Sequence, residues 1–318
     1  MTVIRGFKNL KVNIKGSVIA IGVFDGVHLG HKEVITKVVG RAKLLNLKSV
    51  VITFDPHPLK ALHPGSNIPS LISLKHRIRL IEKLGADILI IVKFTPSLSK
   101  LTPEEFVKRI LVDKALIKEI FVSKNFYFGR GARGGVDTLK AFAEKFGFRV
   151  NVIKPLKIGG IVVSSTRIRK LISRGDIIKA SRFLGRPVSV LGTVVRGLAL
   201  ARVLGYPTAN VNPHHEVMPP EGVYAVMVRF GKSLLKGVLN IGTKPTFYGS
   251  RDREPTIETH IFDFNKRIYG KDIEILFVKK IRDELRFKNP EDLTRQIRRD
   301  KESAKAILAL QSVASMLI

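Results

Sequence analysis

The sequence predicts two folds in series: an α/β first half built on a parallel sheet, and a second half that is an antiparallel β-barrel with one closing helix. Apolar strand patterns alternate with amphipathic helix patterns as far as about residue 183. From about residue 188, short strand patterns follow one another with Gly and Pro between them. The length of 318 residues suits two domains. We therefore expect domains over residues 1–184 and 185–318.

In the first half, each strand pattern leads through a turn into a helix pattern. The expected strands are residues 17–24, 49–54, 86–94, 118–126 and 148–153, and the expected helices are 31–46, 73–85, 102–116 and 136–147. The third helix has the clearest start, because Thr102 suits the N-cap and Pro103 the first helical position. This alternation predicts helices on both faces of a parallel sheet, with ligands at the carboxyl ends of its strands.

In the second half, strand patterns recur without an intervening helix. They cover residues 188–195, 222–230, 234–242, 256–264 and 272–281, and one helix is expected over 289–310. Short strands at this spacing indicate a small barrel. Within 256–264, alternation predicts that Ile257 and Ile261 face the core and that Glu258 faces outward.

Composition restricts the class of protein. Hydrophobic residues make up 45% of the chain, no apolar run approaches the length of a membrane span, and there is no cysteine. We expect a cytoplasmic protein with no membrane partner. The formal net charge of +30 would suit a nucleic-acid-binding protein, but the basic residues are spread along the chain, so an enzyme for polyanionic ligands is the preferred interpretation and no specific nucleic acid is expected.

The stretch IGVFDGVHLGHKEVI, residues 21–35, is the first candidate site. His28 and His31 lie between a strand pattern and a helix pattern. A zinc site is disfavoured because no cysteine and no further ligands with suitable spacing accompany them. Free backbone N–H groups at the start of a helix bind anions, and imidazoles beside them can stabilise charge on a leaving phosphate. The turn is therefore interpreted as a phosphate site rather than a pair of solvated histidines.

Other loops in the first half belong with this turn. TFDPHP follows a strand, SKNFYFGRGARGG follows another, and VSSTRIRK begins a helix. Ser164, Ser165 and Thr166 offer hydroxyls there, and Arg167 adds charge. Alone this reads as an ordinary cap on a basic helix, but two anion sites in one domain fit a nucleoside triphosphate.

These motifs together resemble a known family. Gly-x-Phe-Asp-Gly-x-His-x-Gly-His with a downstream Ser-Ser-Thr-x-x-Arg is similar to the nucleotidylyltransferase superfamily. With TFDPHP between them, the first half resembles the Rossmann-like FMN adenylyltransferase module of the bacterial bifunctional riboflavin kinase/FAD synthetase family. GYPTANV, GVYAV, NIGTKPTF and ETHIFDF resemble its riboflavin kinase domain.

The resemblance implies two ATP-dependent reactions, with riboflavin, FMN and FAD as substrates and products. In the first half it implies catalytic roles for His28 and His31. It also implies nucleotide or flavin binding by Gly22, Phe24, Asp25, Gly26, Gly30, Asn125, Ser164, Ser165, Thr166 and Arg167.

In the second half the resemblance implies that Glu258 is the general base for the riboflavin 5′-hydroxyl. It implies that Thr208 and Asn210 bind Mg²⁺ and ATP phosphate, and that Gly205 lies at the nucleotide. Without the resemblance, PTAN reads as a common turn and Glu258 as a solvated carboxylate.

The chain departs from the family pattern at two places. Ser123 stands where the family often has glycine, and Ala199 and Ala201 stiffen a loop that is usually rich in glycine. Two other interpretations remain open: a nucleotidylyltransferase for another phosphate, such as phosphopantetheine or nicotinamide mononucleotide, and a basic nucleic-acid-binding protein. The sequence does not determine the oligomeric state, and an oligomer is possible.

Overall fold

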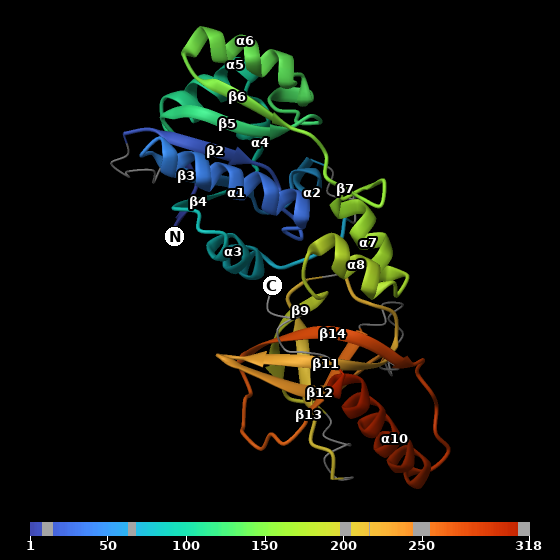
Figure 1. The fold of residues 1–318 in the computed structure, drawn as a ribbon. Coiled ribbons are helices and arrows are strands. Elements are labelled where there is room, and N and C mark those ends of the chain that lie inside the picture. Colours follow the sequence, from blue (N-terminus) through green and yellow to red (C-terminus); the bar gives the residue numbers. More distant parts are fainter. Residues whose placement is uncertain (8–14, 63–67, 198–204, 216, 244–254, 311–318) are drawn as a thin grey trace. The chain divides into compact units, whose positions relative to one another are not determined.

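The computed structural model describes residues 1–7, 15–62, 68–197, 205–215, 217–243 and 255–310 (Figure 1). The contacts between residues divide the chain into two compact units. The sheet unit consists of Met1–Pro69 and Leu74–Ser164, and the barrel unit of Ser70–Ser73 and Ser165–Ile318. Contacts thus assign residues 165–184 to the barrel unit, ahead of the boundary expected from the sequence at 184/185.

The sheet unit is built on six parallel strands in the order β1-β4-β3-β2-β5-β6. Their bounds are β1 Thr2–Arg5, β2 Ser17–Ile21, β3 Lys48–Phe54, β4 Ile88–Val92, β5 Ile117–Ser123 and β6 Arg149–Ile153. The chain winds outward from β2 in one direction through β3 and β4, and in the other through β5 and β6. The carboxyl ends of β2 and β5 therefore form the switch point at which open α/β sheets bind ligands.

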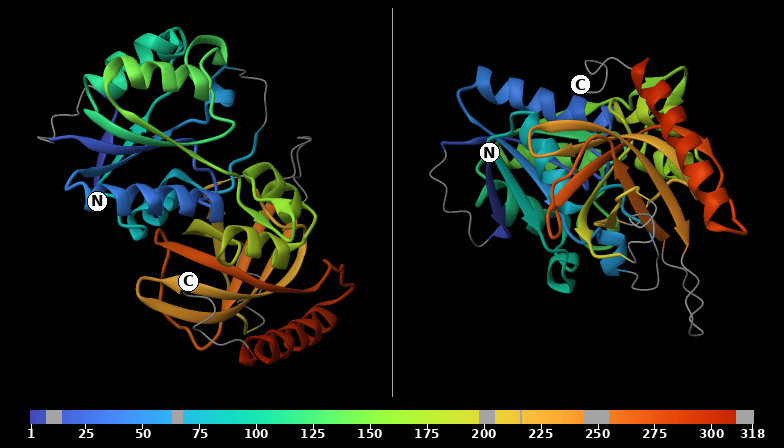
Figure 2. Two further views of the ribbon diagram at one scale, coloured as in Figure 1. Left: turned by 45° about the horizontal axis from the view of Figure 1, so that its top comes forward. Right: turned by 90° about the horizontal axis from the view of Figure 1, so that it is seen from below.

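Helices cover both faces of this sheet, as the alternation predicts. Helices α1 (Leu29–Leu44) and α3 (Leu74–Lys83) lie on one face, and α5 (Pro103–Phe106) and α6 (Val136–Phe146) lie on the other (Figures 1 and 2). The face under α5 and α6 is a continuous apolar core that includes Ile19, Ile52, Ile90, Ile120 and Leu139. Shorter elements are α2 Pro58–Leu62, α4 Pro96–Ser99, the 3-10 turn η3 Arg130–Ala132 and the hairpin of β7 Lys157–Ile158 with β8 Ile161–Val162.

The helix expected over 102–116 begins as predicted but does not stay α-helical. Thr102 Oγ1 accepts from the Glu105 N–H at 3.2 Å, and the Glu105 carboxylate accepts from the Thr102 N–H at 3.0 Å, which is a complete capping box. After Phe106 the chain continues as a π-helix, η2 (Val107–Val112). Propensity and capping do not distinguish the two helix types, so the sequence pattern could not predict this change.

The barrel unit begins with helices α7 (Ser165–Ser173) and α8 (Ile177–Leu184) and continues into a closed antiparallel barrel in the order β10-β13-β12-β11-β14-β9. Its strands are β9 Ser189–Val195, β10 Ala209–Pro213, β11 Gly222–Phe230, β12 Ser233–Thr243, β13 Pro255–Ile261 and β14 Asp272–Arg282. The expected closing helix is α10 (Pro290–Ala309), whose Ala304 and Leu308 pack on apolar residues of the barrel.

Two elements of the barrel unit were missed by sequence reasoning. Strand β10 has the sequence ANVNP, which is short, polar and ends in proline, so it lacks a strand pattern. Helix α8 buries Ile177, Ala180, Phe183 and Leu184, but it lies next to the expected boundary and was assigned to no element. Among the residues that the structure describes, no helix is long and apolar enough to cross a membrane.

Candidate functional site

The two histidines lie where β2 leads into α1, at the switch point of the sheet. His28 is the N-cap of α1, and its Nδ1 accepts from the backbone N–H of His31 at 3.3 Å. The two rings stack with centroids 3.6 Å apart and an angle of 18° between their planes. A Cβ at Gly30 would approach the His28 ring to 3.3 Å, so the helix start packs tightly beneath that imidazole. The structure therefore brings together the histidines that the sequence singled out.

Unusual backbone angles shape the turn itself. Phe24, Gly26 and Val27 have φ of 51°, 84° and 38°, in the region that most side chains avoid. The Phe24 ring covers Gly22, where a Cβ would meet it at 3.3 Å. The rings of Phe24 and His31 are nearly perpendicular, with centroids 5.2 Å apart. Asp25 is 4% exposed. Such strain persists where the surroundings enforce it, which is common at ligand sites.

The third expected loop follows β5, the strand beside β2. Asn125 is exposed just past the end of this strand. Phe126 and Phe128 stack behind it with ring centroids 5.4 Å apart, and Phe128 also packs on Phe106. The loop thus carries Asn125 at the same edge of the sheet as the histidine turn.

The Ser-Ser-Thr-x-x-Arg segment spans the point in the chain where the sheet unit ends and the barrel unit begins. Ser164 ends the sheet unit, and Ser165, Thr166 and Arg167 form the first turn of α7 in the barrel unit. Thr166 and Arg167 are exposed, and the first turn of α7 contains no acidic residue. The helix start expected from the sequence is therefore present, and its approach to the histidine turn remains a prediction.

A second candidate site lies on the barrel. Asn210 of β10 pairs with Glu258 of β13, which pairs in turn with Asn240 of β12. Directly opposed residues in antiparallel strands point to the same face, so these three polar side chains form a row, which we call the barrel row. Glu258 is half-buried, while Ile257 and Ile261 are 1% and 6% exposed. The predicted alternation of this strand is confirmed.

The segment before β10 contacts His260 of the neighbouring strand β13. His260 Nδ1 lies 2.9 Å from the carbonyl oxygen of Pro207, and the Tyr206 ring meets the His260 ring edge to face. Thr208 is half-buried, and Gly205 has a φ of 82°, in the left-handed region. Ala199 and Ala201 lie outside the described residues.

The chemistry of this donor set suits a hard cation. Asn210 offers a neutral amide oxygen on the residue that pairs with Glu258, and Thr208, two positions earlier in the chain, offers a hydroxyl. Mg²⁺ needs few protein ligands because it keeps several waters. In the described part of the chain no group of three or more His, Cys, Asp or Glu side chains could hold a metal ion.

Sequence reasoning missed two further residues. Asn240 is a candidate site residue because it pairs with Glu258 on the neighbouring strand of the barrel. Arg77 of α3 is a candidate because its side chain reaches the carboxyl end of β3. No local pattern reveals either one, although an arginine within the apolar stripe of α3 was a signal that could have been noticed.

The doubly wound sheet, its histidine turn and the oxygen-lined barrel row define the class of protein: a nucleotide-using transferase with two sites. A family model described as FAD synthetase matches residues 10–167, and one described as riboflavin kinase matches residues 184–308.

Relatives of known name align with nearly the whole chain. A protein of Buchnera aphidicola subsp. Schizaphis graminum, named bifunctional riboflavin kinase/FMN adenylyltransferase, is 37% identical over 96% of this chain and 98% of its own. The protein of that name from Escherichia coli (strain K12) is 34% identical over 99% of this chain and 100% of its own. A crystal structure from Streptococcus pneumoniae, described as a macrolide-efflux protein, is 30% identical and superposes with a TM-score of 0.85 over 96% of this chain and 99% of its own.

The chain belongs to the bifunctional riboflavin kinase/FMN adenylyltransferase family. It is a transferase with an FAD synthetase domain followed by a riboflavin kinase domain, and the resemblance inferred from its motifs is confirmed.

Proposed function

We propose that the barrel unit transfers the γ-phosphate of ATP to the 5′-hydroxyl of riboflavin, which gives FMN and ADP. The sheet unit then joins FMN to the AMP part of a second ATP, which gives FAD and pyrophosphate. The observation that supports this best is the stacked histidine pair at the N-terminus of α1, at the switch point of a doubly wound sheet in a chain of this family.

In the adenylyl transfer, a phosphate oxygen of FMN attacks the α-phosphorus of ATP and the bond to pyrophosphate breaks. His28 and His31 hold the phosphates and stabilise the charge that grows on the leaving pyrophosphate, because helix N–H groups and imidazoles converge there. The turn from Gly22 to Gly30 brings the backbone close to the nucleotide, and Asn125 contacts flavin or nucleotide from the neighbouring loop.

Ser164, Ser165, Thr166 and Arg167, at the start of α7, are expected to bind phosphate groups of the triphosphate. No covalent intermediate on the enzyme is needed, so catalysis rests on positioning and on charge stabilisation.

In the kinase reaction, Glu258 takes the proton of the riboflavin 5′-hydroxyl as its oxygen attacks the γ-phosphorus. Thr208 and Asn210 would hold Mg²⁺, which when bound neutralises charge on the ATP phosphates. Gly205 lies where the chain approaches the nucleotide. Asn240, opposite Glu258 in the barrel row, adds a polar side chain beside this reaction site.

The setting of the reactions follows from their substrates. Both steps consume ATP, which supports a cytoplasmic location with flavins and ATP as the partners. No specific nucleic acid and no membrane is part of this function, and an oligomer is compatible with it.

The test is to incubate the protein with riboflavin, ATP and Mg²⁺ and to separate the flavins by chromatography. We expect FMN first and FAD later. With His31→Ala, FAD formation should fall by about a hundredfold to a thousandfold while FMN accumulates. With Glu258→Gln, riboflavin phosphorylation should fall by about a hundredfold or more while supplied FMN is still converted to FAD. If each variant loses both activities equally, the two sites are not separate.

A further inference from the structure

One arginine is buried next to the histidine turn. Helix α3 is amphipathic, and Arg77 occupies its buried side with 4% of its surface exposed, whereas Arg79 of the same helix is exposed. A buried guanidinium needs compensating partners, so its contacts indicate why it is there.

The contacts of Arg77 form a relay toward the turn. Its Nη1 donates to the Phe54 carbonyl oxygen at 2.8 Å and to Thr53 Oγ1 at 3.1 Å, at the end of β3. The Thr53 hydroxyl has one proton, and it donates that proton to the carbonyl oxygen of Val23 at 2.9 Å. Val23 stands immediately before Phe24, the first left-handed residue of the turn. The guanidinium is therefore one hydroxyl away from the backbone that carries the histidines.

The charged groups around Arg77 also lie in the loops near the histidine turn. Burial lowers the pKa of its guanidinium, and the carboxylates of Asp25 and Asp55 oppose that effect. Because an arginine stays protonated in proteins, it remains a fixed positive charge between the loops that follow β2 and β3. Its Nε is buried and has no hydrogen-bond partner among the described residues.

We infer that Arg77 is a positioning residue of the adenylyl-transfer site, which sets the histidine turn through Thr53 and Val23. The inference rests on the function proposed above for the sheet unit. Phe24 and Val27 hold φ angles that residues with a Cβ avoid, and the relay supplies a fixed anchor at the point where this strained segment begins. Displacement of the turn would move both imidazoles relative to the phosphates.

The decisive comparison is between Arg77→Lys, Thr53→Val and the control Arg79→Met, all in the full chain. Lysine keeps a positive charge but not the paired donation from Nη1, and valine removes the hydroxyl of the relay while keeping its shape. For the first two variants we expect kcat for FAD formation from FMN to fall about tenfold to a hundredfold, with KM for ATP changed less than about threefold. Riboflavin phosphorylation by the same molecules and all activities of Arg79→Met should stay unchanged.

Chemical rescue separates positioning from general support of the fold. Arg77→Ala should regain FAD formation when methylguanidinium is added, and Arg79→Ala should not respond. If Arg77→Ala does not fold, Thr53→Val alone carries the test. FAD formation at the level of the Arg79→Met control, a rise in KM with unchanged kcat, or equal loss of both reactions would overturn the inference. If the unaltered protein makes no FAD from FMN, the proposed function fails instead.

Discussion

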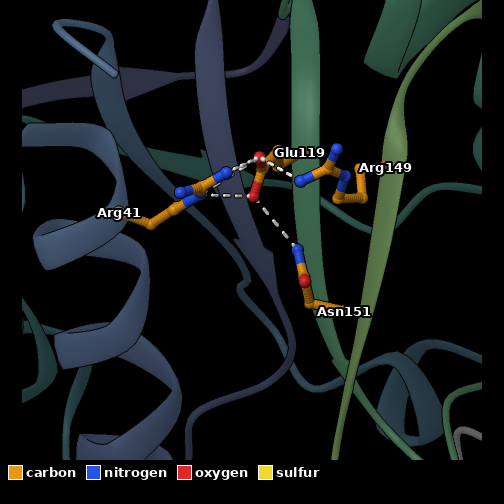
Figure 3. Close-up of polar contacts among 4 residues, drawn as sticks. All are labelled: Arg41, Glu119, Arg149 and Asn151. Atoms are coloured by element: carbon orange, nitrogen blue, oxygen red, sulfur yellow. Dashed lines mark hydrogen bonds and ion pairs between the residues drawn. The ribbon is translucent and has the colours of Figure 1, made fainter. Parts of the chain in front are cut away.

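Glu119 shows how a single buried carboxylate can hold three elements together. It is 5% exposed on β5 and accepts from Arg41 of α1 at 2.7 Å and from the Asn151 side chain of β6 at 3.2 Å (Figure 3). Arg149, also on β6, lies 3.8 Å from the same carboxylate. The network ties the last turn of α1 to the sheet, and α1 is the helix whose first turn carries His31.

This network predicts a loss of stability in acid. The hydrogen bond from Arg41 is the main cause that holds the pKa of Glu119 below its usual value, and Asn151 adds to it. A carboxyl with a lowered folded pKa stabilises the fold above its unfolded pKa of about 4.3, and that stability is lost as pH falls through the lower folded value. Glu119→Gln should therefore lower the urea midpoint at pH 7, and the difference from the unaltered protein should shrink below about pH 4.

Circular dichroism at a series of pH values measures this effect. The control is Glu144→Gln, which changes an exposed carboxyl on α6. A deficit in Glu119→Gln that stays constant from pH 7 down to pH 3 would mean that ionisation of Glu119 contributes nothing.

Residues were predictable from the sequence where their role is set by close neighbours along the chain. His28 and His31 stand three positions apart at a strand-to-helix turn, so the pattern located them and the structure brings their rings together. Arg77 of α3 has its partner at Phe54 in β3, and Asn240 of β12 lies opposite Glu258 in β13. Such pairings follow from strand order and register, which local patterns do not specify.

Elements were predictable where their apolar periodicity was clear. The five main strands of the sheet and the helix that packs on the barrel have strong patterns, and the structure has them close to the expected bounds. Strand β10 lacks such a pattern and is held by pairing with β9 and β13 on either side. Yet this strand carries Asn210, so the element that local reasoning missed is one that positions a candidate ligand.

A glycine beside β10 gives a prediction at this scale. Gly197, just past β9, lies so close to the Asn210 side chain that a Cβ there would overlap its amide. We expect Gly197→Ala to displace the Asn210 amide and to lower the rate of riboflavin phosphorylation by about tenfold to a hundredfold, since small displacements of positioning groups have effects of this size. Conversion of supplied FMN to FAD should be unchanged.

The control is Gly40→Ala in α1, where a Cβ would meet nothing within 4 Å. It should leave both activities intact and raise helix stability by about 0.5–1 kcal/mol. A Gly197→Ala protein with normal phosphorylation of riboflavin would show that the orientation of Asn210 does not matter for the kinase reaction.

At the scale of the whole molecule, the net charge of +30 is not explained by either site. It predicts binding to nucleic acid that is independent of sequence and weakens steeply with salt, because the contacts release counterions from phosphates. Titration of a labelled duplex at two salt concentrations measures it. A tight complex at physiological salt that distinguishes one sequence from another would instead support the nucleic-acid-binding alternative.

The position of the domain boundary also belongs to the scale of the whole molecule. The sequence predicts a boundary at 184/185, and contacts divide the chain at Ser164/Ser165. The difference is the helix pair α7 and α8, which belongs to the barrel unit. Phe183 and Leu184 of α8 are 2% and 3% exposed, and the Ser181 hydroxyl accepts from the N–H of Val188 just before β9.

Two fragments distinguish these boundaries. Residues 165–318 keep α7 and α8 on the barrel, and residues 186–318 lose both. A fully buried side chain the size of Phe or Leu contributes about 1.5–3 kcal/mol, so the shorter fragment should unfold at a clearly lower temperature. Both should phosphorylate riboflavin at low temperature, since Thr208, Asn210 and Glu258 lie within each, and only the longer one should remain active on warming. Neither should make FAD, because the histidine turn is absent. Equal melting temperatures would favour the boundary at 184/185, and loss of kinase activity from both folded fragments would mean that the kinase site needs the sheet unit.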